Sequence, residues 1–346
     1  MRLLLITQRI DARDTNLAVH VRWLREIASQ VDHVDVIAQS VGDAPALSNV
    51  TLRSLGKEQG KGKFGQMLRL LGMLPGVVRR ADAVLVLMVP LYVLAAWPFA
   101  FLRRKPMFLW YTHKHVSWHL RIAERLLTGI FSASKESFRL PTRKVQFLGH
   151  AVDTEFFSPG DEPRAPGHLV TVGRIAPAKR IELMIDAVEL LRRGGRDVWL
   201  DIIGEPILES DKTYADVLRR DVEQSGLTNF IHFLGPKSPE EVVDLSRRAS
   251  VCLNASVTGS LDKAGLEAMA TGCPFVTTNE AFRDIVPEGF VSEASPERFA
   301  LRISEMLDRH PGVSVLRDRV LAGHDMKTTL TKLLAIVKRS TVSHQQ

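Results

Sequence analysis

The stretch SVTGSLDKAGLEAMATGCPFVTT, residues 256–278, decides the fold of this chain. Its pattern predicts a loop, a short helix over 264–270 and a strand over 275–278. Gly272 is a typical stop for the helix, and Pro274 suits the entry to the strand. The N-terminus of such a helix faces the rim formed by the carboxyl ends of neighbouring strands, where open α/β sheets bind ligands. The stretch therefore predicts an α/β fold with a ligand site over the helix start.

The start of this helix is suited to a diphosphate. Ser260 and Asp262 are both candidate N-caps, and the loop through Gly259 offers free backbone N–H groups. Unsatisfied N–H groups and the helix dipole favour an anion there. Glu267 lies one turn further on, where its carboxylate could accept hydrogen bonds from a polyol. A surface ion pair with Lys263, four residues earlier, explains the same glutamate equally well.

The segment GLEAMATGCPFV, residues 265–276, resembles the signature of the family 4 retaining glycosyltransferases of GT-B fold. The fuller family motif is a glutamate, seven residues, a second glutamate, then Ala-Met-Ala and Gly-x-Pro. Glu267 matches the second glutamate, which the resemblance implies binds the ribose of a sugar nucleotide. Gly259 stands where the first family glutamate contacts the donor sugar, so this chain departs from the pattern. The resemblance is densest over 169–278 and weak over the first hundred residues.

The chain has room for two domains. At 346 residues it can bury two cores, and its composition is that of a globular protein. Strands and helices alternate, which predicts doubly wound parallel sheets. With the resemblance, this predicts a GT-B fold, in which two Rossmann-like domains face each other across a cleft. The expected parts are an N-terminal acceptor domain over 1–157, a Pro- and Gly-rich linker over 158–167, a donor domain over 168–325, and a C-terminal helix within 326–346 that crosses back to the first domain.

The first loop holds two acidic residues. A strand over 3–7 and an amphipathic helix beginning near Leu17 flank the polar loop 8–16. Asp11 and Asp14 in this loop could orient acceptor hydroxyls. Aspartate more often forms turns, and that interpretation is favoured here.

The uncharged stretch 83–102 meets the length criterion for a transmembrane helix. Pro90 and Pro98 interrupt it, and its first six residues favour a β-strand, so we expect a buried strand and a helix that covers the sheet. The next strand, 107–110, delivers His113 to the carboxyl rim. A histidine in a polar loop needs no special role, but the resemblance implies that His113 contacts the donor sugar near the reacting carbon.

Two cations follow the first strand of the second half. That strand, which begins at His168, ends in Gly173-Arg174, and Lys179 comes five residues later at the expected start of a helix over 180–193. Cations at a strand end and a helix start suit a diphosphate leaving group, although ordinary surface charges would have the same spacing. The resemblance implies that His113, Arg174 and Lys179 are catalytic and that the donor-binding residues are Gly173, Gly204, Lys237, Gly259, Ser260, Leu261, Asp262, Lys263 and Glu267.

Positive charge is concentrated in the N-terminal part. Residues 1–155 hold 22 Lys and Arg against 12 Asp and Glu, whereas the remainder holds 24 against 27. Such a surplus favours phosphate-bearing partners, including an anionic membrane. The basic amphipathic segment 64–80 could lie on a membrane surface or simply cover the sheet. No nucleic-acid-binding module is recognisable. Cys252 and Cys273 lack metal-ligand spacing and are expected to be buried thiols in a reducing compartment.

We therefore predict a retaining glycosyltransferase that moves a sugar from a nucleotide-sugar donor to a glycan or lipid-linked acceptor. No metal cofactor is expected, because an Asp-x-Asp motif is absent and Arg174 with Lys179 can supply the positive charge. A cytoplasmic protein held peripherally on the inner face of the membrane fits the charge distribution. Two alternatives are a nucleotide-sugar epimerase, for which more carboxylates near the sugar are expected, and a non-catalytic sugar-nucleotide binding protein.

Overall fold

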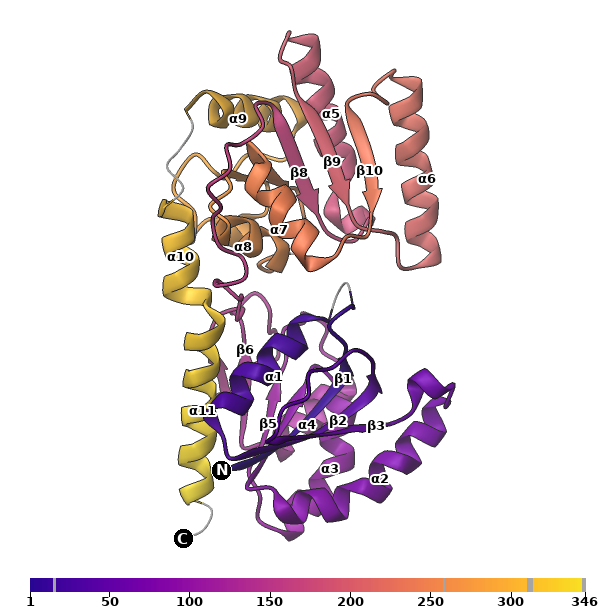
Figure 1. The fold of residues 1–346 in the computed structure, drawn as a ribbon, viewed down its shortest axis with the longest axis vertical. Coiled ribbons are helices and arrows are strands. Elements are labelled where there is room, and N and C mark those ends of the chain that lie inside the picture. Colours follow the sequence, from indigo (N-terminus) through magenta and orange to yellow (C-terminus); the bar gives the residue numbers. More distant parts are fainter. Residues whose placement is uncertain (15–16, 258, 310–313, 344–346) are drawn as a thin grey trace. The chain divides into compact units, whose positions relative to one another are not determined.

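The chain folds into two compact units (Figure 1). The computed structural model describes residues 1–14, 17–257, 259–309 and 314–343. The first unit comprises Met1–Ala151 with His324–Gln346, and the second comprises Val152–Gly323. Each unit is built on one parallel sheet, as the alternation of strands and helices predicted.

The first unit has a seven-stranded sheet in the order β3-β2-β1-β4-β5-β6-β7, so the strand order reverses between β1 and β4. Its strands are β1 (Arg2–Ile10), β2 (His33–Val41), β3 (Val50–Ser54), β4 (Ala83–Leu87), β5 (Met107–Trp110), β6 (Gly129–Ser132) and β7 (Val145–Phe147). Its helices are α1 (Val19–Gln30), η1 (Lys57–Gln59), α2 (Lys63–Arg80), α3 (Pro90–Leu102), α4 (Trp118–Leu126) and α11 (Met326–Ser343).

The second unit has a five-stranded sheet in the order β10-β9-β8-β11-β12, so the order reverses between β8 and β11. Its strands are β8 (His168–Val172), β9 (Trp199–Ile203), β10 (Ile231–Gly235), β11 (Val251–Asn254) and β12 (Phe275–Thr277). Its helices are η2 (Pro177–Lys179), α5 (Ile181–Arg193), α6 (Glu209–Gln224), α7 (Pro239–Arg248), α8 (Lys263–Ala270), η3 (Glu280–Phe282), α9 (Pro296–Arg309) and α10 (Ser314–His324).

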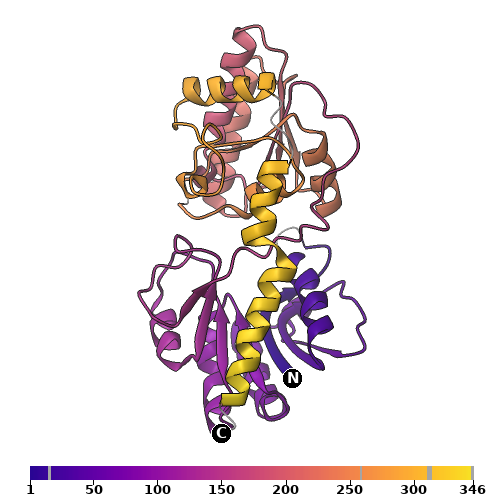
Figure 2. The same cartoon turned by 90° about the vertical axis from the view of Figure 1, so that its left-hand side faces the viewer.

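The sheet of the first unit is buried on both faces. Leu3 and Leu5 of β1 pack in a core with α1 and α11, whereas Leu4 and Ile6 pack in a second core with α2, α3 and α4. Figure 2 shows α11, in yellow, running along this unit. Because both faces are covered, the central strands are apolar throughout instead of alternating.

The uncharged stretch 83–102 forms the buried strand β4 and the helix α3, as expected. Tyr92, Val93, Ala96 and Ala100 place one side of α3 in the core. None of the helices that the structure describes is both long enough and apolar enough to cross a membrane.

The helix and the strand predicted within 256–278 lie close to their expected bounds. The helix α8 begins one residue early, at Lys263, and β12 ends at Thr277. The N–H of Gly272 donates to the Met269 carbonyl at 3.0 Å, and the N–H of Cys273 donates to the Ala268 carbonyl at 3.2 Å. These two bonds satisfy the last turn of α8, so the predicted stop at Gly272 is confirmed. Cys252 and Cys273 are buried and unbridged, and burial raises the pKa of the Cys252 thiol.

The expected linker 158–167 is part of the second unit, whose boundary lies at Ala151/Val152. The Arg164 guanidinium donates to the carbonyl oxygens of Ala249 at 2.8 Å and Gly272 at 2.7 Å. Pro and Gly prevent a helix or strand there, and side-chain hydrogen bonds hold the irregular segment in place instead. The composition of 158–167 therefore indicated correctly that this segment has no regular secondary structure. The first domain was expected to end at residue 157, whereas the first unit ends at Ala151, six residues earlier.

His324 is a buried titratable group of the first unit. Its Nδ1 accepts a hydrogen bond from the His150 N–H at 3.2 Å, and the two rings lie 5.8 Å apart. Burial lowers the pKa of His324 from 6.5 to about 4. The unfolded chain therefore binds a proton at this residue near pH 6.5, whereas the folded chain binds it only near pH 4. The folded state is therefore not penalised by His324 above pH 6.5. As the pH falls from 6.5 toward 4, the free energy of unfolding decreases, because the unfolded chain binds a proton that the folded chain does not.

We predict that His324→Gln flattens the pH dependence of folding. From pH 7.5 to pH 5, the free energy of unfolding should fall about 2 kcal/mol more in the unmodified chain than in the variant. Urea titrations followed by tryptophan fluorescence measure this, since four of the five tryptophans lie in the first unit. The exposed His115→Gln is the control. Equal pH slopes for all three proteins would contradict the assignment.

Candidate functional site

Glycines line the carboxyl rim of the second sheet. Gly173, Gly204 and Gly235 follow or end the neighbouring strands β8, β9 and β10, and all three have positive φ. A Cβ atom on Gly204 would lie 2.0 Å from the Gly173 carbonyl oxygen. A side chain at 204 would therefore push the two strand ends apart. The structure brings the predicted residues Gly173 and Gly204 together at this rim.

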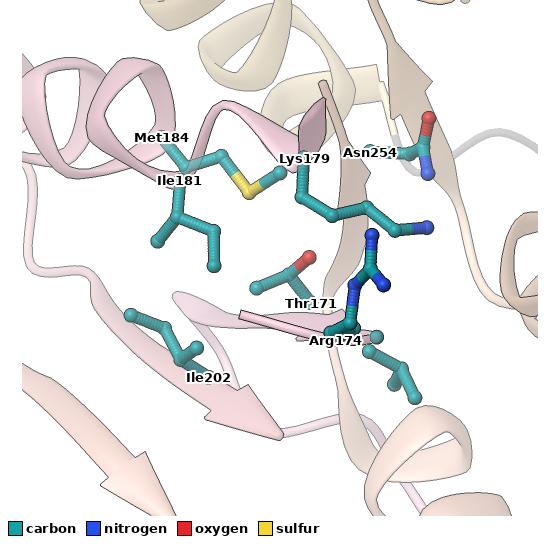
Figure 3. Close-up of a pocket in the computed structure, with 9 residues that line it drawn as sticks. Thr171, Arg174, Lys179, Ile181, Met184, Ile202 and Asn254 are labelled. Atoms are coloured by element: carbon teal, nitrogen blue, oxygen red, sulfur yellow. The ribbon is translucent and has the colours of Figure 1, made fainter. Parts of the chain in front are cut away.

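Two cations stand over this rim. Gly173, Arg174 and Lys179 line a pocket together with Asn254, and Figure 3 shows the Arg174 guanidinium directed toward the end of the Lys179 chain. Lys179 lies in the 3₁₀ turn η2 instead of in α5, which begins at Ile181. Its aliphatic chain rests on Gly173, where an added Cβ would meet Cε at 3.4 Å. Arg174 and Lys179 therefore converge on one pocket.

The two cations differ in their neighbours. The Arg174 side chain is 41% exposed, and its Nε lies 3.6 Å from Asp211 Oδ2. Asp211 also accepts the Leu208 N–H at the start of α6. Lys179, in contrast, donates to the Asp262 carboxylate, whose side chain is only 10% exposed. Both cations therefore face a carboxylate, but Arg174 is the more exposed of the two and its ion pair is the longer one.

Asp262 is the N-cap residue of α8, but it does not cap the helix. Its side chain makes no hydrogen bond to the first turn. The same Oδ2 that receives Lys179 also accepts Asn254 Nδ2 at 3.0 Å. Of the two candidate N-caps, Asp262 is therefore the one at the N-cap position, but its carboxylate pairs with a lysine distant in sequence instead of bonding the first turn.

Two buried asparagines hold the loop between β11 and α8. Asn254 Oδ1 accepts the hydroxyl of Thr277 at 3.1 Å and of Ser256 at 3.3 Å. Asn279 Nδ2 donates to Ser256 Oγ at 3.1 Å and to the Ser260 carbonyl at 2.9 Å. Leu261 anchors the same loop in the core. The sequence analysis did not identify these asparagines, although each follows or ends one of two adjacent strands and could have been found from that.

Glu267 and Gly259, the two positions compared with the family glutamates, each have a local structural explanation. Glu267 Oε1 lies 3.2 Å from Lys263 Nζ, so the ion pair that the spacing allowed is present. Gly259 has φ of 59°. A glutamate there would cost roughly 1–2 kcal/mol in this left-handed conformation. The backbone as folded therefore disfavours the first family glutamate at this position.

Lys237 lies just before α7 and bonds to a glutamate in the first turn of that helix. Its Nζ donates to Glu241 Oε1 at 3.1 Å, and Ser238 forms a capping box with the same glutamate. Its side chain therefore has a role in holding α7.

His113 belongs to the first unit and follows β5. Its ring is exposed, and Nδ1 accepts the His115 N–H at 3.0 Å. The Tyr111 hydroxyl donates to the His115 carbonyl at 2.8 Å, which ties down the loop. The histidine is thus fixed on one side and open on the other.

Asp11 and Asp14 form turns. Asp11 accepts the N–H groups of Arg13 and Asp43, and Asp14 accepts the Leu17 N–H at 2.7 Å. The turn-forming interpretation matches these bonds. Asp14 also lines a cavity of about 430 Å³ at the rim of the first unit, with Gln8, Arg9, Leu17, Gln39, Ser40, Lys57 and Glu58.

Residues 166–309 match the family model "Glycosyl transferases group 1". D-inositol 3-phosphate glycosyltransferase of Acidothermus cellulolyticus is 29% identical over 227 residues, which are 59% of this chain and 50% of that protein. The enzyme of the same name from Kribbella flavida is 32% identical over 173 residues, 44% and 40% of the two chains. This chain therefore spans half the length or less of these curated relatives.

Solved structures resemble the whole chain. Anabaena HepE in complex with UDP has a TM-score of 0.75 at 15% identity, covering 98% of this chain and 100% of that one. Sucrose-phosphate synthase from Thermosynechococcus elongatus has a TM-score of 0.75 at 14% identity, covering 99% and 100%. At such identities the likeness shows the fold, which is the GT-B arrangement of two Rossmann-like domains that the sequence predicted.

Proposed function

Since the chain is a member of the glycosyl transferases group 1 family over residues 166–309, we propose that it moves a sugar from a nucleotide-sugar donor to an acceptor. The observation that carries the proposal is the convergence of Arg174 and Lys179 above a rim of glycines. Departure of a nucleoside diphosphate concentrates negative charge at one point, and fixed cations there lower the barrier. The second unit is then the donor domain and the first unit the acceptor domain.

Each site residue has a proposed part in this reaction. Arg174, Lys179 and the N-terminus of α8 stabilise the diphosphate as the bond to the sugar breaks. Gly173 and Gly204 let the donor approach the backbone. Glu267 accepts hydrogen bonds from the ribose, and His113 of the first unit holds the donor sugar. Gly259, Ser260, Leu261, Asp262 and Lys263 form the loop around the donor, and the backbone near Lys237 contacts the base. Retention of configuration follows from the family resemblance alone.

The acceptor is proposed to be a glycan or a lipid-linked precursor. A soluble, phosphate-bearing acceptor is the second candidate, because the relatives above are named for inositol phosphate and sucrose phosphate. Lys57, which lines the cavity of the first unit, could bind such a phosphate. Nucleotide release from UDP-, GDP- and ADP-sugars, with and without lipid-phosphate or sugar-phosphate acceptors, tests both. An epimerase would interconvert donors without release, and a binding protein would do neither.

We predict that Glu267→Gln weakens nucleotide binding about tenfold or more, because a hydrogen bond to a charged acceptor contributes about 1.5–3 kcal/mol. Calorimetric titration with the preferred nucleoside diphosphate measures the change. Glu223→Gln, an exposed position on α6, is the control. Unchanged affinity in a folded Glu267 variant would mean that this residue serves only its ion pair with Lys263.

We predict that transfer needs no divalent metal. Arg174→Ala and Lys179→Ala should each lower the rate by about 10²–10³, since each removes a charge that a metal ion would otherwise supply. EDTA should leave the rate unchanged. Arg220→Ala on α6, which removes an exposed cation of the same unit, should have no effect. Loss of activity in EDTA that magnesium restores would contradict the mechanism.

The first unit carries a basic and apolar surface that supports a proposed peripheral membrane location on the cytoplasmic leaflet. Phe64, Leu68 and Leu71 lie on one side of α2 and are exposed, Phe64 by 78%. Lys61 and Lys63 flank the start of this helix. A second exposed group, at the opposite end of the parallel strands, follows from the end of α3, where Phe101 is exposed by 66% and Arg103, Arg104 and Lys105 come next. Exposed apolar side chains next to cations suit an anionic bilayer, where each cation contributes up to about 1 kcal/mol.

We predict binding to vesicles that contain anionic lipid, weakening as salt is raised because screening shortens the reach of the charges. The double variant Lys61→Glu/Lys63→Glu should sediment at least tenfold less with these vesicles. Lys212→Glu/Arg220→Glu, the same charge reversal in the second unit, should sediment like the unmodified protein. Failure of the unmodified protein to sediment at low salt would refute the membrane location and leave the donor site untouched.

A further inference from the structure

A carboxylate lies beside the proposed diphosphate pocket of the second unit, bonded to two of the residues that line it. Asp262 Oδ2 accepts from both Lys179 Nζ and Asn254 Nδ2. It stands at the N-terminus of α8, where the helix dipole favours an anion. A negatively charged oxygen bonded to Lys179 over a helix start has the chemical character of a phosphate oxygen. Asp262 thus resembles, inside the protein, the group that the pocket is proposed to bind.

This carboxylate is firmly placed. Asn254, which holds it, is itself bonded to Ser256 and Thr277 in the interior of the unit. The N–H of Val257 donates to the Ala178 carbonyl at 3.0 Å, so the loop is also tied to the turn that carries Lys179. The ion pair therefore joins two segments that are already fixed relative to each other.

The two cations of the pocket are balanced by two carboxylates. Arg174 and Lys179 each face one carboxylate, from Asp211 and Asp262 respectively. The diphosphate of a nucleotide sugar carries two negative charges and would meet a site without net positive charge. A diphosphate next to Asp262 is also repelled by it, because like charges a few ångströms apart are costly where water is scarce.

We propose that Asp262 competes with the diphosphate for Lys179, so that donor binding and product release are an exchange of one anion for another. The inference rests on the proposed function of this pocket. In the empty site, Asp262 holds Lys179. An arriving diphosphate draws the Lys179 ammonium group away from Asp262, and after sugar transfer the return of Lys179 to the fixed carboxylate helps to expel the nucleoside diphosphate. Asp262 is therefore a positioning residue that acts through Lys179 and limits the affinity of the site.

The test is calorimetric titration of Asp262→Asn with UDP, GDP and ADP and with the matching uncharged nucleosides. The variant keeps the shape of the side chain and removes its charge. For the nucleoside diphosphate that the unmodified chain binds best, affinity should rise at least tenfold, and its inhibition of transfer should tighten by the same factor. Affinity for the uncharged nucleoside should not change, whereas a disturbed loop would weaken both. Asp262→Ser, which can still serve as an N-cap, is the second variant.

Two controls isolate the exchange. Glu223→Gln removes one negative charge from α6 and should leave every affinity unchanged. In a Lys179→Met background, Asp262→Asn should gain less affinity than in the unmodified background. An equal gain in both backgrounds, or unchanged or weaker diphosphate binding in both Asp262 variants, overturns the inference while the proposed function stands. Absence of nucleoside diphosphate binding by the unmodified chain overturns the proposed function and the inference with it.

Discussion

The reversal of strand order between β8 and β11 is the constraint on which the second unit depends. Loops that follow strands on either side of such a reversal leave in opposite directions, so a crevice opens between them. The loop after β8 carries Gly173 and Arg174, and the loop after β11 leads to Asp262. The topology of the sheet therefore places Arg174, Lys179 and Asp262 at or beside this crevice.

A loop at such a position can be rigid only if its polar groups are satisfied. Asn254 and Asn279 meet this need with their side-chain amides, which bond to hydroxyls and to a carbonyl of the loop. The buried amides fix the loop before any ligand arrives, and preorganised groups stabilise a developing charge without further rearrangement. The same rigidity keeps the Asp262 carboxylate within reach of Lys179.

Local patterns predicted much of the fold. The strand β5 has the expected bounds, because a short apolar run depends on neighbouring residues only. The segment 158–167 was expected to link the two domains, but it belongs to the second unit. Its Pro and Gly content indicates that it has no helix or strand, and says nothing about hydrogen bonds to distant residues. Arg164 shows the difference, since its guanidinium ties that segment to Ala249 and Gly272.

The sequence by itself determined the α/β class, the rim that holds Arg174 and Lys179, and the helix stop at Gly272. Each follows from residues within about one element of each other, where propensity and periodicity act. Only the tertiary structure decided the partner of Asp262. As an N-cap it had a local hydrogen bond available, but Lys179, 83 residues away in sequence, is brought beside it by the pairing of β8 with β11. A charged partner in a half-buried site binds a carboxylate more strongly than a backbone N–H does, and no local pattern in the sequence records that competition.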